Sequence, residues 1–172
     1  MKKAEVDKLL QKTAQGDNVA FERLYEKTKR GVFAFLYTYL QNYADTEDAM
    51  QTVYLKIKTG ISSYRAGSNG SAWILQIAKN HALNELKQRK PTTPIEEAEL
   101  IAKESESTES GVMDVMDRVL TVEERRMVTL HVLWGYKHRE IGELLDCPTG
   151  TVTSKYKRAI EKLRKALKEV EA

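Results

Sequence analysis

Residues 138–159 read HREIGELLDCPTGTVTSKYKRA, and this stretch decides the fold expected for the C-terminal part of the chain. Its first half places Ile141 and Leu144 at the spacing that puts apolar side chains on one face of a helix. Pro148 then interrupts the pattern, and Thr149 stands where it can cap a second helix. A short helix, a break of about three residues and a second helix with a polar start are typical of a helix-turn-helix.

The second helix of this motif is expected to have one apolar face and one basic face. Between residues 149 and 168 there are seven Lys and Arg residues but only one acid, Glu161. Hydroxyl groups and Arg or Lys side chains reach base edges in a major groove, and lysines neutralise phosphates. We therefore expect this face to bind DNA, with a merely solvated face as the alternative. The turn itself often contains glycine, and Asp146-Cys147-Pro148 departs from that pattern. The expected apolar stripe consists of Val152, Tyr156, Ala159, Ile160, Leu163 and Leu167.

A further helix is expected just before this motif. Thr121 and Glu124 have the spacing of a capping box, in which each side chain satisfies a free N–H at the helix start. The helix is expected to stop at Gly135. Its predicted buried side chains are Met127, Leu130 and Trp134.

The composition of the whole chain predicts an all-α fold. Its 172 residues include 9 glycines and 3 prolines, too few for a turn-rich β sandwich, and 41% are hydrophobic, enough for a core. The single cysteine, Cys147, excludes an intramolecular disulfide framework. No apolar run approaches the roughly 20 residues that span a bilayer, and the N-terminus lacks the apolar segment of a secretion signal. We therefore expect a helical, cytoplasmic protein.

Charge divides the chain into three parts, although the net charge is only +3. Residues 1–90 contain 15 Lys and Arg against 9 Asp and Glu, and residues 119–172 contain 11 against 8. Between them, residues 91–118 contain 2 against 8. Two basic blocks therefore flank one acidic connector.

The start of the connector has the composition of a linker. From Pro91 to Gly111 it is rich in Ser, Thr and Glu, and it offers little apolar area to offset the entropy of ordering. We therefore predict two small helical domains, residues 1–90 and 113–172. A flexible acidic linker at residues 91–112 is expected to join them.

The N-terminal domain shows successive helical patterns. Asp17 can cap the first, Asp45 stands where the next begins, and Ser71 can cap a long helix that runs through Leu86. A polar, glycine-containing loop at residues 60–71 precedes that last helix. The helix that Asp45 begins would have an inner face of Met50, Val53, Tyr54 and Ile57.

Three segments resemble bacterial sigma factors, in the order in which that family has them. Residues 138–159 resemble the C-terminal DNA-binding region, with GTVTSKYKRA at 150–159 as the more specific part. Residues 44–56 resemble the polymerase-binding segment, and residues 72–86 resemble the promoter-melting helix. The short two-domain length is that of the extracytoplasmic-function (ECF) group. The resemblance implies a non-catalytic factor that directs RNA polymerase to promoters, in response to a stress or another signal.

The resemblance implies a polymerase contact at residues 44–56, where the family packs on a coiled coil of the largest polymerase subunit. The candidate contact residues are expected to form a mixed polar surface on one exposed helix. The alternative is that their acids only favour the helix N-terminus. They are Asp45, Glu47, Asp48, Gln51, Tyr54 and Lys56.

The resemblance also implies a site for the minus-ten promoter element. The loop at residues 62–71 matches the family's pocket for a flipped base, which needs a polar cradle. Asn80 and Asn84 share a helix face and carry amides that can pair with base edges. A mobile surface loop and a solvated basic face are the alternatives, and Trp73 is expected in the core. The candidate minus-ten residues are Ser68, Asn69, Lys79, Asn80, Asn84, Lys87 and Arg89.

The last helix is the candidate reader of the minus-thirty-five element. Thr153 stands where the family often has a cation, and Lys155 where it often has arginine. Because lysine lacks the bidentate geometry of arginine on guanine, the family's target sequence does not carry over. The later cations of the helix are expected to be solvated or close to phosphates. The candidate minus-thirty-five residues are His131, Thr151, Thr153, Ser154, Lys155, Lys157 and Arg158.

The implied partners are core RNA polymerase, including its flap, promoter DNA and an anti-sigma factor. No small-molecule substrate, metal or cofactor is expected, because three histidines and one cysteine offer no metal-ligand set and no Gly-rich phosphate loop is present. A helix-turn-helix repressor with a helical N-terminal dimerisation domain is a rival interpretation, but it leaves residues 44–56 and 72–86 unexplained. An enzyme is a second rival, and an inactive sigma-like decoy is a third.

Overall fold

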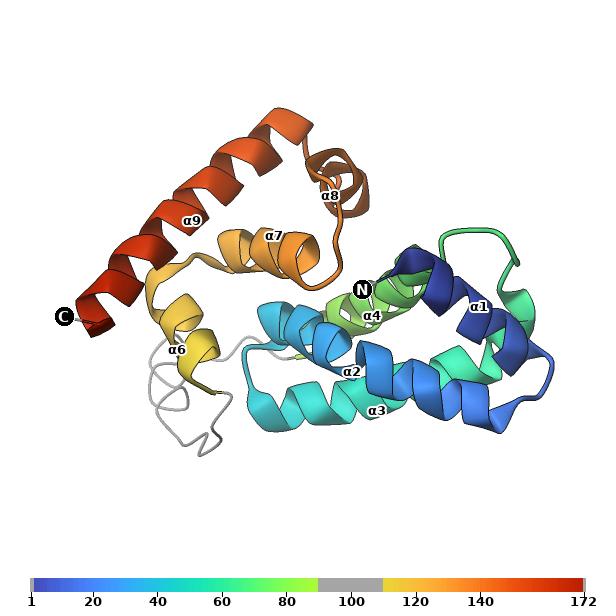
Figure 1. The fold of residues 1–172 in the computed structure, drawn as a ribbon. Coiled ribbons are helices and arrows are strands. Elements are labelled where there is room, and N and C mark those ends of the chain that lie inside the picture. The colour runs from blue at the N-terminus through green and yellow to red at the C-terminus, as the bar shows by residue number, and fades with distance from the viewer. Residues whose placement is uncertain (1, 90–109, 172) are drawn as a thin grey trace.

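The computed structural model describes residues 2–89 and 110–171, and in these ranges every regular element is a helix (Figure 1). This confirms the predicted all-α fold class. Most of the predicted linker, up to residue 109, lies outside the described residues. No helix in the described ranges is long and apolar enough to cross a membrane.

The N-terminal half is a bundle with α2 at its centre. This helix packs against α1, α3 and α4 and contributes the buried Leu24 and Phe35 (Figure 1). The first helix is not among the sequence predictions, although its Val6 and Leu10 are also buried. The elements are α1 (Lys3–Ala14), α2 (Asn18–Leu40), α3 (Tyr43–Thr59), η1 (Ile61–Ser63) and α4 (Gly70–Gln88).

The starts of these helices confirm one predicted cap and correct two others. The Asp17 side chain accepts a hydrogen bond from the Ala20 N–H, as expected. Asp45 is not the cap of α3, because Asn42 lies one turn earlier and accepts from the Asp45 N–H. Ser71 is not the cap of α4, since it is buried and Asn69 takes that role. In both cases an asparagine upstream of the predicted residue has the extended backbone that a cap needs.

The C-terminal half contains the predicted helix-turn-helix. The capping box of Thr121 and Glu124 is present at the start of α7. Three residues separate α8 from α9, as predicted, and Thr149 is the first residue of α9. Residues 110–112 form the start of α6, whereas the prediction places them in the linker. The elements are α6 (Ser110–Val119), α7 (Val122–Val132), α8 (His138–Leu145) and α9 (Thr149–Glu171).

The two halves are packed together through α2 and α7. Trp134 is fully buried, as predicted, but it lies against α2 of the other half. Its indole N–H donates to the Gly31 carbonyl at 3.1 Å. A Cβ on residue 31 would stand 2.9 Å from the indole ring, so glycine permits this close approach. One apolar core therefore continues from the N-terminal bundle into the C-terminal half.

Polar contacts also join the two halves. The Arg126 guanidinium lies 3.6 Å from the centre of the Tyr39 ring and donates to the Thr38 carbonyl. The Tyr37 hydroxyl donates to Asp117 at 2.9 Å. Burial and the Asp117 carboxylate raise the pKa of Tyr37 to about 12, so the hydroxyl keeps its proton at neutral pH. The interface therefore combines a buried indole with charge-assisted contacts at its edge.

Candidate DNA and polymerase interfaces

The turn of the helix-turn-helix is tightly packed. Asp146 ends α8 in the left-handed region, with φ of 52°, and so takes a conformation that glycine usually adopts. The Cys147 N–H donates to the Gly142 carbonyl at 2.9 Å, and a Cβ on Gly142 would stand 2.5 Å from the Cys147 carbonyl oxygen. Val152 is fully buried and holds α9 against the rest of the motif.

The candidate minus-thirty-five residues of α9 differ in exposure. Ser154, Lys157 and Arg158 are exposed, and Thr151, Thr153 and Lys155 are half-buried. Lys155 forms an ion pair with Glu123 of α7. The face opposite Val152 therefore presents one hydroxyl and two cations to the solvent.

His131 is set apart from the other candidates. It belongs to α7, is half-buried, and its Nδ1 donates to the Tyr136 carbonyl at 2.8 Å. Its ring packs against those of His138 and Tyr156. Both the burial and the hydrogen bond tie His131 to the interior of the motif.

The candidate minus-ten amides share one open face of α4. Asn80 and Asn84 are both exposed, and the Gln76 side chain donates to the Asn80 amide oxygen at 3.0 Å. The exposed set also includes Lys87 and Arg89. The helix therefore offers amides and cations to a nucleic acid strand along about two turns.

Lys79 of α4 has a different environment. It is half-buried, its ammonium group donates to the Leu144 carbonyl at 2.7 Å, and it lies 3.6 Å from Asp146. Both partners belong to the C-terminal half. In this arrangement the helix-turn-helix covers one of the candidate phosphate contacts.

The loop before α4 is held by a buried aromatic pair. Tyr64 is buried, and its ring lies 5.2 Å from that of Trp73, which packs against the core as expected. Ser68 and Asn69 are exposed beside it, but both are engaged locally. The Ser68 hydroxyl donates to the Arg65 carbonyl at 2.6 Å, and the Asn69 oxygen caps α4.

Most of the candidate polymerase residues on α3 are exposed, but Tyr54 is not. Glu47, Asp48, Gln51 and Lys56 are exposed. Tyr54 is only 5% exposed, and its hydroxyl lies 2.6 Å from the Thr28 hydroxyl. The sequence places Tyr54 both on the inner face of α3 and, through the family resemblance, on its surface. The apolar spacing of α3 puts it inside, next to Tyr25 and Phe21.

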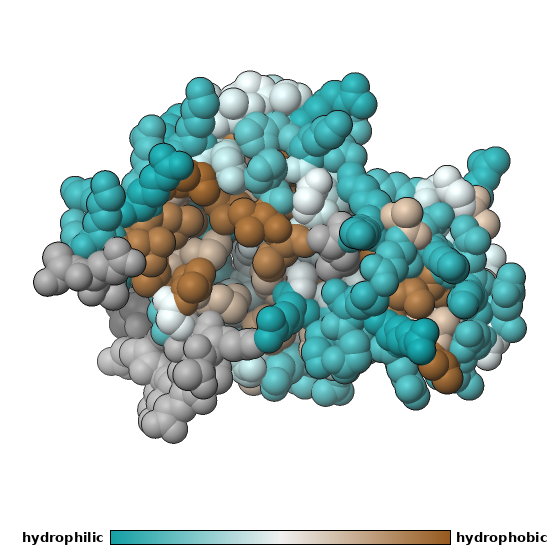
Figure 2. Space-filling model, viewed as in Figure 1, coloured by the Kyte–Doolittle hydropathy of each residue, from teal (hydrophilic) through white to brown (hydrophobic). Residues whose placement is uncertain are grey.

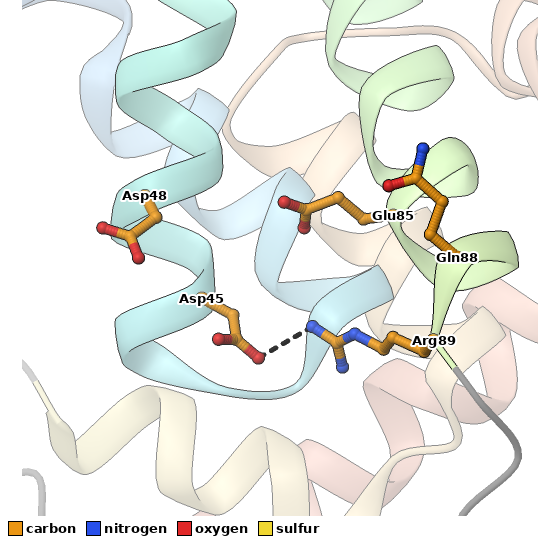
Figure 3. A pocket seen from close by; sticks show the side chains of 5 residues that line it. All are labelled: Asp45, Asp48, Glu85, Gln88 and Arg89. Carbon is orange, nitrogen blue, oxygen red and sulfur yellow. Dashed lines mark hydrogen bonds and ion pairs between the residues drawn. The ribbon is translucent and has the colours of Figure 1, made fainter.

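A pocket of about 290 Å³ lies between the start of α3 and the end of α4. Asp45, Asp48 and Glu85 supply carboxylates, and Gln88 and Arg89 complete the lining (Figure 3). The Arg89 guanidinium reaches across the pocket to Asp45, at 2.7 Å. The pocket thus joins a candidate polymerase residue to a candidate minus-ten residue.

His81 lies farther along the same pair of helices. Lys56 donates to its Nδ1 at 3.2 Å, and Glu85 lies 3.6 Å from its Nε2. Burial and the Lys56 charge lower the pKa of His81, so the ring is neutral at pH 7. The Lys56 side chain therefore points toward α4.

One residue of this surface is absent from the sequence prediction. Leu55 of α3 is 62% exposed, beside the exposed Gln51 and Lys56. The signal was present in the sequence, because Leu55 falls outside the inward-facing stripe that Val53 and Ile57 define. The described residues also contain no cluster of three or more His, Cys, Asp or Glu suited to a metal ion.

An apolar area lies on one face of the C-terminal half. Figure 2 shows apolar residues gathered below α9 on the side toward α6. Large exposed apolar side chains on these two helices are Val112 and Leu167. The same part of the molecule contains a second, smaller core cluster that includes Leu120, Val128 and Ala159.

The chain matches two models of the sigma-70 class of RNA polymerase subunits. Residues 24–92 match sigma-70 region 2, and residues 118–163 match sigma-70 region 4. The first match contains α3 and α4, and the second contains α7, α8 and most of α9. The two halves of the fold therefore correspond to the two sigma regions.

Curated relatives define the group within this class. The ECF RNA polymerase sigma-E factor of Haemophilus influenzae is 30% identical, over 89% of this chain and 90% of that protein. SigM of Mycobacterium tuberculosis is 28% identical, over 92% of this chain and 83% of that protein. SigW of Bacillus subtilis is 24% identical, over 96% of this chain and 98% of that protein. The chain belongs to the ECF RNA polymerase sigma factors, which direct transcription initiation, as the sequence motifs predicted.

Solved structures agree on the fold. CnrH, solved in complex with the cytosolic domain of CnrY, is 18% identical with a TM-score of 0.64, over 98% of this chain and 99% of that one. RpoE of Bartonella quintana is also 18% identical, with a TM-score of 0.63, over 86% and 96%. Together with the family matches, these comparisons support the sigma factor over the helix-turn-helix repressor.

Proposed function

We propose that the C-terminal half, residues 113–172, reads the minus-thirty-five element through the first half of α9. The observation that carries this is the exposed Ser154, Lys157 and Arg158 on the helix that follows a three-residue turn. A hydroxyl and two cations at the start of a recognition helix suit base edges and phosphates together. Thr151, Thr153 and Lys155 border this surface, and His131, which packs beneath α9 against Tyr156, completes the proposed set.

The N-terminal half, residues 1–90, takes the polymerase and minus-ten roles in this proposal. Glu47, Asp48 and Gln51 of α3 face the coiled coil of the largest polymerase subunit. Asn80 and Asn84 of α4 read the melted strand. The remaining candidates border these two surfaces, namely Asp45, Lys56, Ser68, Asn69, Lys79, Lys87 and Arg89. Tyr54 is excluded, because its side chain is buried.

This assignment requires the two halves to separate during initiation. Lys79 is largely covered while it donates to the Leu144 carbonyl, because its side chain is only 16% exposed in the docked form. Separation also lets the acidic linker set the distance between the two promoter elements. Binding of α3 to polymerase does not need this step, since Glu47 and Asp48 are already exposed in the docked form.

We further propose that the chain is a non-catalytic cytoplasmic factor controlled by an anti-sigma protein. Both structural neighbours were solved with a bound partner, the cytosolic domain of CnrY for CnrH and the anti-sigma factor NepR for RpoE. The polymerase flap is a further expected contact. We assign the flap contact to the apolar area over α6 and α9.

The test is run-off transcription with purified core RNA polymerase on a pool of genomic promoter fragments, with and without the full chain. Start sites that appear only with the chain are expected, and their upstream sequences would reveal both promoter elements. Polymerase binding without new transcripts would indicate the decoy. Tight binding to duplex DNA with no polymerase association would indicate the repressor.

A further inference from the structure

Three rings meet beneath the recognition helix. His131 comes from α7, His138 from the first residue of α8, and Tyr156 from α9. The ring centres lie 5.1 Å apart for the two histidines, 4.7 Å for His131 and Tyr156, and 5.0 Å for His138 and Tyr156. Since α8 also packs directly against α9 (Figure 1), the cluster can influence the side chains that α9 presents to DNA.

One hydrogen bond connects this cluster to a candidate DNA-reading residue. The His138 Nδ1 lies 3.0 Å from the Thr153 hydroxyl oxygen. That hydroxyl already donates its only proton to the Thr149 carbonyl, also at 3.0 Å. A hydroxyl has one proton to give, so the Thr153 oxygen must accept from His138. The ring is therefore protonated at Nδ1.

The other ring nitrogen of His138 is unprotonated. Its Nε2 is buried and has no hydrogen-bond partner among the described residues. A second N–H at that atom would be unsatisfied, and its charge would face His131. Burial and the neighbouring His131 also lower the pKa of His138. The neutral tautomer with the proton on Nδ1 is thus the form that the surroundings favour.

We propose that His138 is a positioning residue that sets how Thr153 takes part in minus-thirty-five recognition. With its proton given to Thr149 and one lone pair used by His138, the Thr153 oxygen can only accept one more hydrogen bond. Thr153 therefore offers DNA an acceptor and a methyl group. In a major groove these fit the amino group of adenine or cytosine, or the methyl group of thymine, but not the acceptor edge of guanine. This inference rests on the proposed role of α9.

The experiment measures base preference with holoenzyme on a promoter library randomised through the minus-thirty-five element. His138→Leu removes this donor, so that only the bond to the Thr149 carbonyl still orients the Thr153 hydroxyl, and its proton can turn toward an acceptor on DNA in exchange for that one bond. We expect the discrimination against guanine to fall at one position only, on the order of fivefold, which corresponds to one hydrogen bond. His138→Asn keeps a nitrogen donor close to the place of Nδ1 and is expected to restore the preference.

Two controls separate positioning from packing. Tyr156→Leu disturbs the same ring cluster without touching the Thr153 hydroxyl, so it should change overall activity but not the ranking of bases. Thr153→Val removes the hydroxyl, and in that background His138→Leu should have no further effect on base preference. Equal weakening at every position in His138→Leu, or an unchanged preference, would overturn the proposal.

Failure of the inference is distinguishable from failure of the proposed function. Nitrogen NMR of the free full chain reports the His138 tautomer without DNA, and a proton on Nε2 would overturn the positioning role. A wild-type holoenzyme with no preference anywhere in the minus-thirty-five region would instead refute the role of α9, whatever the tautomer.

Discussion

At the scale of single residues, ion pairing decides which cations of α9 remain available to DNA. Lys155 is paired with Glu123, and Lys162 donates to both carboxylate oxygens of Glu124, at 3.0 and 2.8 Å. Lys162 is exposed, as expected of a solvated side chain, but it is also paired with α7. Because Lys155 is paired with an acid of α7, Lys157 and Arg158 are the exposed cations in the first half of α9.

Arg158→Ala is expected to reduce the contribution of the minus-thirty-five element by about 1–3 kcal/mol. The reason is that a base-reading arginine contributes both affinity and discrimination, whereas a phosphate contact contributes affinity alone. The measurement is transcription from promoters with single changes in the element. Arg164→Ala, an identical change in the second half of α9, should leave the base ranking intact. An unchanged ranking with Arg158→Ala would contradict the assignment.

The Glu124 carboxylate is expected to make the C-terminal half sensitive to acid. Burial acts to raise its pKa, but hydrogen bonds from Lys162 and Thr121 outweigh this and hold the pKa below its ordinary value of 4.5. A lowered pKa in the folded state stabilises the fold above pH 4.5, and this stability is lost as the pH falls through the lower value. Denaturant unfolding from pH 7 to pH 3 should therefore show a smaller loss for Glu124→Gln than for wild type. An equal loss of stability in the two proteins between pH 7 and pH 3 would exclude this role of Glu124.

At the scale of elements, α3 combines acids with an exposed leucine on one side and buried aromatic contacts on the other. The buried side, with Val53, Tyr54 and Ile57, follows from helical spacing. The exposed side is not explained by stability, because an exposed Leu55 beside charged residues gains little from folding. The simplest explanation of this surface is that it binds a partner protein.

Asp48→Lys and Leu55→Asp are each expected to weaken binding to core polymerase at least about tenfold, or 1.4 kcal/mol. The first reverses the charge that Asp48 offers to the polymerase, and the second places a charge where Leu55 offers an apolar contact. Fluorescence anisotropy with labelled full chain measures the affinity. Glu22→Lys, a charge reversal at an exposed position of α2, is the matched control and should bind as wild type. Normal binding by both α3 variants would move the polymerase site elsewhere.

At the scale of the whole molecule, the contact between Trp134 and Gly31 joins the two halves, and the docked C-terminal half engages Lys79, one of the proposed minus-ten residues. The indole is fully buried, and Lys79 is engaged by the end of α8. Domains of one chain move relative to one another unless the interface between them is large and hydrophobic. A factor that spans two promoter elements requires such a motion.

Gly31→Met is expected to separate the halves while leaving α2 intact, because methionine favours a helix by about 0.7 kcal/mol or more over glycine. Its side chain would occupy the space of the indole, which lies 2.9 Å from a Cβ at this position. In a Trp73→Phe background, Trp134 is the single tryptophan, so its fluorescence should shift to longer wavelength on exposure. X-ray scattering should show a larger radius of gyration. A blue, unshifted emission with unchanged size would contradict the role of this contact.

Much of this protein follows from its sequence alone. The all-α fold, the capping box at Thr121, the three-residue turn after α8 and the membership of the sigma family are all local patterns, in which residues close in the chain determine one another. The errors at Asp45 and Ser71 were also local, since a second cap residue competed a few positions upstream.

The contacts between distant residues depend on how the whole chain packs. Helical spacing predicts that Trp134 is buried but not which residue it contacts. That residue is Gly31, about a hundred positions away. The same holds for Lys79 on Leu144, for Arg89 on Asp45 and for His138 on Thr153. A periodic pattern specifies which face of a helix is buried, whereas the neighbour on that face depends on how all the helices pack at once.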